Sequence, residues 1–172
     1  MVRNLDIQDH RFEFEWAQYT LKPILKFKRL TETAILPTRA TEGAACFDLY
    51  ADEKQWLDDM RTRRLISTGI AIELPPGHVG MICSRSGLAA NEGIFVVNAP
   101  GIIDEDYRGE LKVTLGRLPF TPQWPSETIF LVEPGMRIAQ LMILPPPQLA
   151  VEETTNLTTT QRGASGFGST GA

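Results

Sequence analysis

The stretch Glu110-Leu111-Lys112-Val113-Thr114-Leu115 alternates polar and apolar side chains without a break. Successive side chains of a β-strand point to opposite faces, so this period of two is typical of a strand with one face in the core. On either side of it lie short apolar runs punctuated by glycine and proline. These runs are Arg64–Ile72, Val79–Cys83, Ile94–Val97, Ile129–Val132 and Ile138–Leu144, with a shorter alternating run at Leu25–Lys28. Many short strands of this kind predict an all-β sandwich or barrel.

Helix-period patterns are scarce in the chain. The sequence predicts one short helix of one or two turns after Ser86, over Gly87–Asn91. Two other segments, Phe12–Tyr19 and Asp52–Met60, are further candidates for a helix.

Size and charge exclude several classes of protein. A chain of 172 residues is the size of one domain, and no apolar run approaches the about 18 residues of a membrane helix. The first residues lack the apolar core of a secretory signal, so we expect a cytoplasmic protein that binds no membrane. With a net charge of −4, sequence-independent electrostatic binding of nucleic acid is not expected. Cys46 and Cys83 are expected to be buried, reduced thiols.

The chain divides into three parts. Residues 22–150 carry the strand patterns and form the expected β domain. Residues 1–21 are an aromatic N-terminal extension, and residues 151–172 are a Thr-, Gly- and Ser-rich arm whose composition alone indicates disorder. Within the domain, Pro119–Ser126 holds three prolines and a Trp, which predicts a protruding loop at 118–126 rather than a central strand.

Four features stand apart from the core pattern. Ser84–Gly87 follows a strand and could bind phosphate oxygens, or simply form a turn and helix start. Gly101–Gly109 contains three carboxylates that could hold a water, a cation or a sugar hydroxyl, or form a solvated turn. Asp48 lies among small and apolar residues, where an ion pair with an Arg is favoured over a catalytic role. In the arm, Arg162 and Phe167 could form a flap with a cation for phosphate and a ring for stacking.

Taken in order, five segments resemble the five motifs of the trimeric dUTP pyrophosphatases (dUTPases). They are Ala40–Ala51, Cys83–Ala89, Gly101–Gly109, Gly135–Leu141 and Arg162–Gly171. The resemblance covers the chain from about residue 22 to its end, and five motifs in register make it specific. It implies a jelly-roll-like β fold with one short helix, assembled as a homotrimer with active sites shared between subunits. It also implies hydrolysis of dUTP to dUMP and pyrophosphate with Mg²⁺ on the triphosphate, which keeps uracil out of DNA and supplies dUMP for dTMP synthesis.

The resemblance assigns the reacting groups and the base-binding residues. Asp104 is similar to the family's general base, which orients and deprotonates the attacking water and meets the 3'-hydroxyl. Tyr107 is similar to the Tyr that packs under deoxyribose and leaves no space for a 2'-hydroxyl. The uracil slot would comprise the Asn98 side chain and backbone groups around Gly101, Ile103 and Lys112.

The remaining implied contacts concern the phosphates. Arg85, Ser86 and Gly87 would bind phosphate oxygens, and Gln140 would reach the α-phosphate region. Asp48 would act on Mg²⁺ only indirectly, through its water shell. In the arm, the predicted substrate-binding residues are Arg162, Phe167, Gly168 and Ser169: Arg162 and Ser169 would contact the γ-phosphate and Phe167 would stack on uracil.

Other functions compete with this assignment. A dCTP deaminase-like or bifunctional enzyme shares the fold, but would need a Glu that activates water at the base. A regulatory binding protein could use the same scaffold and dock a protein partner through the N-terminal extension or the 118–126 loop, since aromatic residues favour interfaces. A purely structural β protein would leave the five motifs unexplained.

Overall fold

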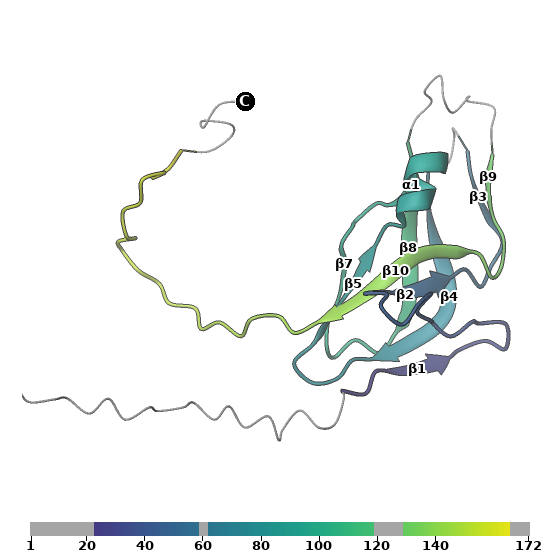
Figure 1. The fold of residues 1–172 in the computed structure, drawn as a ribbon, viewed down its shortest axis with the longest axis horizontal. Coiled ribbons are helices and arrows are strands. Elements are labelled where there is room, and N and C mark those ends of the chain that lie inside the picture. Colours follow the sequence, from purple (N-terminus) through teal and green to yellow (C-terminus); the bar gives the residue numbers. More distant parts are fainter. Residues whose placement is uncertain (1–22, 59–61, 119–128, 166–172) are drawn as a thin grey trace, which may run out of the picture.

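Two four-stranded antiparallel sheets form the body of the protein, and a two-stranded ribbon extends it at one end (Figure 1). The computed structural model describes residues 23–58, 62–118 and 129–165. One sheet has the strand order β1-β4-β8-β6, the other β2-β10-β5-β7, and the ribbon pairs β3 with β9. The elements are β1 (Lys26–Arg29), β2 (Phe47–Tyr50), β3 (Gln55–Leu57), β4 (Arg63–Glu73), β5 (Val79–Cys83), α1 (Ser86–Glu92), β6 (Ile94–Val96), β7 (Gly101–Ile103), β8 (Glu110–Arg117), β9 (Phe130–Val132) and β10 (Arg137–Leu144). The predicted all-β, jelly-roll-like sandwich is confirmed, with one short helix among the described residues.

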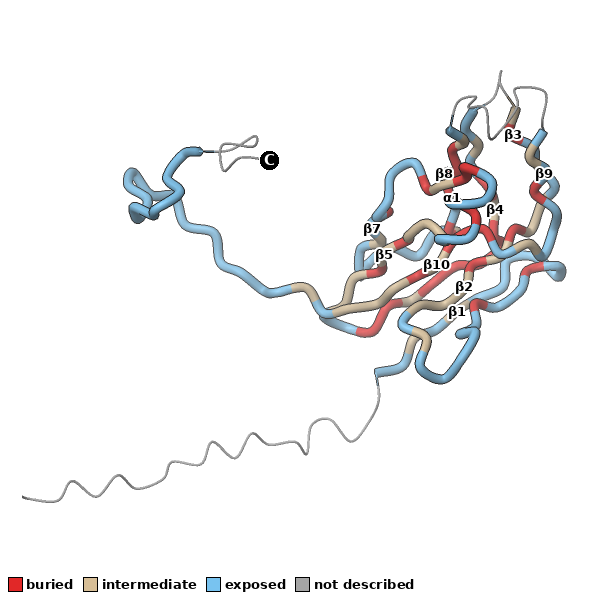
Figure 2. Tube along the Cα trace, turned by 45° about the horizontal axis from the view of Figure 1, so that its top comes forward, coloured by how far each residue is buried: buried red, intermediate tan, exposed pale blue. Residues whose placement is uncertain are grey.

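The alternation in β8 sorts its side chains between core and surface as predicted. Leu111, Val113 and Leu115 are buried, whereas Lys112 is exposed. The buried side chains join those of both sheets in one core, which follows the strands through the middle of the body (Figure 2). Burial of apolar area of this kind is the main force that holds two sheets together.

The central pair of the first sheet contains an irregularity that a glutamate stabilises. The register of β4 on β8 shifts between Ser67 and Ala71. Gly69, inside this stretch, has a φ of 63°, and a Cβ there would lie 2.6 Å from Asp52 Oδ2, so only glycine fits. The Glu110 carboxylate accepts hydrogen bonds from the Ser67 hydroxyl and from the Gly69 N–H, the latter at 2.9 Å. Glu110 therefore satisfies the Gly69 N–H, which the interrupted ladder leaves unpaired, and also binds the Ser67 hydroxyl.

The helix expectations have different outcomes. The short helix after Ser86 is confirmed as α1, and Gly93, in the left-handed conformation, ends it. The expected helix over Asp52–Met60 is wrong, because this segment contains β3, whose Leu57 is fully buried and whose Trp56 pairs with Leu131 of β9. The partner strand lies about 75 residues away in the sequence, and a local pattern cannot reveal such a partner.

Several predictions fall outside the described residues. They concern the helix at Phe12–Tyr19, the 1–21 extension and the 119–126 loop. Of the arm, residues 151–165 are described: they are exposed and contain neither helix nor strand. No helix within the described ranges has the length and apolar character needed to cross a membrane.

The two cysteines are free, as expected, but half-buried rather than buried. Burial raises the pKa of the Cys46 thiol, and nearby Cys83 adds to the effect. The thiol of Cys46 is therefore protonated at neutral pH and a weak nucleophile.

We expect the stability of the fold to depend on the ionised Glu110. Burial opposes ionisation, but the hydrogen bonds from Ser67, Gly69 and Lys112 outweigh it, so the pKa of Glu110 lies below its ordinary value of 4.5. A lowered pKa contributes stability above pH 4.5, and this contribution disappears as the pH falls through the folded-state pKa. Glu110→Gln should lower the free energy of unfolding at pH 7 by about 1 kcal/mol.

Urea unfolding of both proteins from pH 7 to pH 3 measures this effect. The difference between wild type and Glu110→Gln should shrink below pH 4.5. A difference that stays constant with pH would show that the ionised form of Glu110 contributes nothing.

Candidate active site

The turn between β5 and α1 is fixed by hydrogen bonds from two other strands. The Ser84 hydroxyl accepts a hydrogen bond from the Val96 N–H at 2.9 Å, and the Ser84 carbonyl accepts one from the Gln140 side-chain amide at 2.8 Å. After this turn, Ser86 and Gly87 begin α1 and are exposed. A Cβ on Gly87 would meet nothing within 4 Å, so the space beside it is open. First-turn N–H groups of a helix lack helical partners and are available to an anion.

Asp48 lies between two guanidinium groups at this turn. Its Oδ1 is 3.3 Å from Arg85 Nε, and its Oδ2 is 3.2 Å from Arg137 Nη1. The Asp48 side chain is only 13% exposed. Arg85 also donates from Nη1 to the Arg137 carbonyl at 2.9 Å, so strands β2 and β10 and the start of α1 are joined. The predicted ion pair of Asp48 with an Arg is confirmed, and it involves two arginines.

The two arginines on Asp48 affect whether its carboxylate can bind a metal ion. Both oxygens of the Asp48 carboxylate face guanidinium groups, so its charge is already balanced by two cations and it is a poor direct ligand for a third. Within the described parts of the chain, no three His, Cys, Asp or Glu side chains are grouped to hold a metal ion. The described residues of one chain therefore offer no ready set of Mg²⁺ ligands, and phosphate oxygens would supply ligands to a magnesium ion at this turn.

The predicted base-binding segment forms the connection between β7 and β8. The Tyr107 N–H donates to the Asp104 carbonyl at 3.1 Å, and the Tyr107 hydroxyl donates to the Glu110 carbonyl at 2.8 Å. A Cβ on Gly109 would lie 2.5 Å from the Tyr107 hydroxyl oxygen, so this position requires glycine. The ring of Tyr107 is thus fixed at its edge while 41% of the residue stays exposed.

Asp104 is exposed at the beginning of this connection. Within the residues that the structure describes, its carboxylate has no hydrogen bond or ion pair, whereas the neighbouring Glu105 carboxylate accepts a hydrogen bond from the Gly77 N–H. A carboxylate without an internal partner is available to a water or a sugar hydroxyl.

Among the described strands, β7 is the last of its sheet and pairs only with β5, so its other edge is free of them. Its unpaired backbone N–H and C=O groups can be read by the edge of a base. Asn98 lies directly against this strand, since a Cβ on Gly101 would be 3.2 Å from Asn98 Nδ2. Of the other predicted slot residues, Ile103 is half-buried and Lys112 is exposed, with its ammonium 3.3 Å from Glu110 Oε2.

The structure does not bring all predicted residues together within one chain. In the antiparallel pair of β5 and β7, Ile82 lies opposite Gly101 and Gly80 opposite Ile103. Asp104 therefore follows the end of β7 that lies beside Val79, whereas Ser84 follows the other end of β5. Five residues of strand separate these ends, which corresponds to about 17 Å.

The arm residues are also remote from both groups. Arg162 is exposed, and its Nε donates to the Ser165 carbonyl within the arm at 3.0 Å. Figure 1 shows the arm leaving the body after β10 and running away from it. The predicted contacts of Phe167, Gly168 and Ser169 lie outside the described residues.

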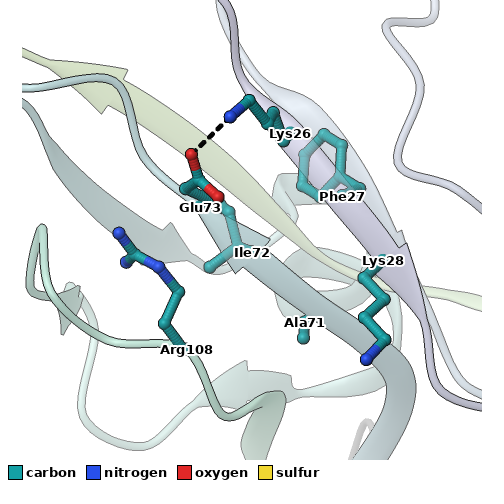
Figure 3. Close-up of a pocket in the computed structure, with 7 residues that line it drawn as sticks. All are labelled: Lys26, Phe27, Lys28, Ala71, Ile72, Glu73 and Arg108. Atoms are coloured by element: carbon teal, nitrogen blue, oxygen red, sulfur yellow. Dashed lines mark hydrogen bonds and ion pairs between the residues drawn. The ribbon is translucent and has the colours of Figure 1, made fainter.

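A surface pocket of about 390 Å³ lies elsewhere, along β1 and β4 (Figure 3). Lys26 pairs with Glu73 at 2.6 Å inside it, and Arg108 from the β7–β8 connection lies on the same side as Glu73, across from β1. None of the residues predicted to bind phosphate or base lines this pocket. Its size therefore does not mark it as the reaction site.

Sequence reasoning missed three residues of these clusters. Arg137 lies inside the fourth motif but received no role, although it is the second arginine on Asp48. Glu105 and Arg108 hold the connection that carries Asp104. Their charge was visible in the sequence, but their partners are residues distant along the chain or main-chain carbonyls.

Comparison with known proteins gives consistent matches. The family model for dUTPase matches residues 32–171. The deoxyuridine 5'-triphosphate nucleotidohydrolase of Clostridium kluyveri is 46% identical over 147 residues, which cover 86% of this chain and 97% of that protein. The protein of the same name from Sinorhizobium medicae is 45% identical over 157 residues, covering 88% and 93%.

Solved structures show the same fold. The dUTPase of Staphylococcus bacteriophage 80alpha, determined with dUPNHPP, matches with a TM-score of 0.77 and 25% identity, covering 87% of this chain and 99% of that one. A mutant dUTPase from phage phi11 of S. aureus, in which a structural Mg(II) ion is coordinated, matches with a TM-score of 0.70 and 21% identity. It covers 79% of this chain and 99% of that one.

We expect the carboxylate of Asp48, which is largely shielded from solvent, to stabilise the fold through its two arginines. Asp48→Asn should lower the free energy of unfolding by about 1–2 kcal/mol, because it leaves two guanidinium groups facing each other without their counter-charge. The matched control is Glu133→Gln, whose ion pair with Lys54 at 3.4 Å is at the surface. This control should cost less than about 0.5 kcal/mol. Equal losses in urea unfolding would contradict a special role for the Asp48 cluster.

Proposed function

The chain belongs to the dUTPase family, and we propose that it hydrolyses dUTP to dUMP and pyrophosphate by attack of water on the α-phosphorus. The observation that carries this function is the meeting of Arg85, Arg137 and Gln140, from distant parts of the sequence, at the open turn before α1. A triphosphate needs such a site, because negative charge collects on the departing pyrophosphate as the reaction proceeds.

The phosphates bind at the turn between β5 and α1. The Arg85 guanidinium and the N–H groups of Ser86 and Gly87 meet phosphate oxygens, with Ser86 near the bridging and leaving oxygens. Gln140, whose amide nitrogen is held by the Ser84 carbonyl, reaches the α-phosphate region. Held by Asp48, Arg85 needs little reorganisation when the substrate arrives, and this preorganisation favours the charged transition state.

The nucleoside binds at the connection between β7 and β8. Uracil meets the free edge of β7 at Gly101 and Ile103, together with the Asn98 side chain and the backbone at Lys112. Fixed donors and acceptors of this kind reject cytosine, whose exocyclic amine reverses the pattern. The ring of Tyr107, anchored by its hydroxyl to the Glu110 carbonyl, packs under the deoxyribose and excludes a 2'-hydroxyl.

Asp104 is the general base. Its carboxylate, exposed and without a partner among the described residues, accepts the proton of the attacking water and orients the oxygen toward the α-phosphorus. Mg²⁺ enters on the triphosphate as part of the substrate and neutralises charge on its oxygens. Asp48 acts on the substrate only indirectly, by holding Arg85 and Arg137.

The two halves of the site come from different subunits of a homotrimer. The distance of about 17 Å between the ends of β5 and β7 separates the phosphate side from Asp104 within one chain. The outer face of the second sheet supports contact between copies, because Met142 and Met81 lie opposite each other there and Met81 lies opposite Ile102, which is 55% exposed. Such an apolar face is favoured at a subunit interface.

The arm, residues 151–172, closes the site of another subunit. Leu149, Val151 and Leu157 are 79%, 99% and 87% exposed, so these side chains find no cover on their own chain. Arg162 lies 18 positions after Leu144, and an extended chain of this length spans up to about 60 Å. Arg162 and Ser169 then bind the γ-phosphate, Phe167 with Gly168 covers uracil, and closure excludes water. Residues 22–150 form the β domain and residues 1–21 an extension to it.

Two other functions make different predictions. A dCTP deaminase-like enzyme would release ammonia from dCTP, and a panel of dUTP, dCTP, dTTP and UTP with and without Mg²⁺ separates the two activities. A binding protein that docks a partner through residues 1–21 or the 118–126 loop would lose that partner, and keep turnover, when the segment is deleted.

We expect Asp104→Asn to lower kcat for dUTP by at least about 10³-fold, since the amide cannot accept the proton of the water. Binding of a non-hydrolysable dUTP analogue should change less than about threefold, because the amide keeps the shape of the carboxylate. The measurements are pyrophosphate release and calorimetric titration. Residual turnover within tenfold of wild type would contradict the assignment of the base.

Mixed trimers test the shared site. Asp104→Asn and Arg85→Ala homotrimers should both be inactive. Co-refolding the two variants at equal ratio should restore about one quarter of wild-type turnover. Each shared site takes Asp104 from one chain and Arg85 from another, and both are intact in about one quarter of the sites. A mixture of Asp104→Asn with Asp104→Ala is the control and should stay inactive. No recovery in the first mixture, despite mixed trimers by mass spectrometry, would place both residues in one chain's site.

A further inference from the structure

The connection that carries Asp104 receives little support from the sheets. Residues 104–109 are all exposed, and they join β7 of one sheet to β8 of the other. Before them, β7 is a three-residue strand paired on one side only. Without further contacts, a connection of this kind would let the Asp104 carboxylate move relative to the substrate.

Glu105 supplies one such contact. Its Oε2 accepts a hydrogen bond of 2.7 Å from the N–H of Gly77. Gly77 follows Pro75 and Pro76, which have no N–H, so it is the first residue after Leu74 that can donate from the main chain. Gly77 has a φ of 70°, a left-handed conformation that favours glycine at this turn.

Arg108 stabilises the same connection through hydrogen bonds to main-chain carbonyls within it. Its Nη1 donates to the Glu105 carbonyl at 2.6 Å and to the Tyr107 carbonyl at 2.9 Å. The Arg108 side chain also lines the pocket beside Glu73 (Figure 3). Together with the hydrogen bond from the Tyr107 N–H to the Asp104 carbonyl, these contacts shape the turn that Glu105 fastens to the body.

The three carboxylates of the connection differ in their partners. Within the described part of the chain, Glu105 has one, whereas the Asp104 and Asp106 carboxylates have none. We propose that Glu105 is a positioning residue: its hydrogen bond to the Gly77 N–H fixes the connection so that Asp104 is aimed at the attacking water. The proposal rests on the role proposed above for Asp104. A general base must be placed closely, because a displacement of about 1 Å can cost about 10²-fold in rate.

The test compares two substitutions of Glu105. Glu105→Ala removes the acceptor and should lower kcat for dUTP about tenfold while KM changes less than about twofold. Glu105→Gln keeps an oxygen that can accept from the Gly77 N–H and should restore kcat to within about threefold of wild type. Asp106→Ala, which removes a carboxylate without a described partner one residue further on, is the matched control and should retain wild-type kcat.

A second measurement reports the tether without turnover. Amide hydrogen exchange of the segment around Gly77 should speed up in Glu105→Ala and stay at the wild-type rate in Glu105→Gln and Asp106→Ala. A Glu105→Ala kcat within twofold of wild type, or equal losses in Glu105→Ala and Glu105→Gln, would overturn the proposal. So would unchanged exchange at Gly77 in Glu105→Ala. Absence of dUTP hydrolysis in the wild type would instead overturn the proposed function, and the exchange rates would still report whether the tether exists.

Discussion

The pairing of β5 with β10 on one side and β7 on the other determines the geometry of both halves of the site. Gln140 lies opposite Cys83 and also opposite Asp48, so the Gln140 amide reaches Ser84 while Asp48 meets Arg85. On its other edge, β5 pairs with β7, and this pairing places Asp104 at the far end of the sheet. The hydrogen bonds between these strands therefore bring together the proposed phosphate-binding groups and separate them from Asp104, the proposed general base. A single chain cannot close this distance without breaking the ladder, and this is the physical reason for proposing that the site is shared between copies.

Charge is distributed unevenly in this acidic chain. With a net charge of −4, the protein as a whole would repel a triphosphate, yet two guanidinium groups are gathered at one turn. Asp48 makes this possible, because a carboxylate of low exposure offsets the repulsion between Arg85 and Arg137 before any ligand arrives. Both arginines keep exposed surface, at 26% and 48% of the side chain, so they can turn part of their donors toward an anion. A negative overall charge with two arginines at one turn favours binding of a compact polyanion over general attraction of negative polymers.

Local patterns in the sequence predicted the strands whose own side chains show a clear apolar run or alternation. The alternation in Glu110–Leu115 and the run Val79–Cys83 correspond to strands of the structure, and the helix follows Ser86. The helix expected over Asp52–Met60 was wrong because β3 exists only through its pairing with distant β9. For the site, the motifs located Asp104, Arg85 and Gln140 along the chain but not in space. Arg137 and Glu105 were not predicted, since their roles depend on contacts with residues 89 and 28 positions away.

The free edge of β7 has a consequence for the behaviour of the protein in concentrated solution. An unpaired strand edge can recruit a strand of another molecule and start the growth of an intermolecular sheet. β7 offers only three residues, and the chain then turns sharply at Asp104, so an incoming strand would find few hydrogen bonds before the edge ends. The shortness of β7 thus limits aggregation, while its edge stays open to the nucleobase of the proposed substrate. Lengthening this strand would put that protection at risk.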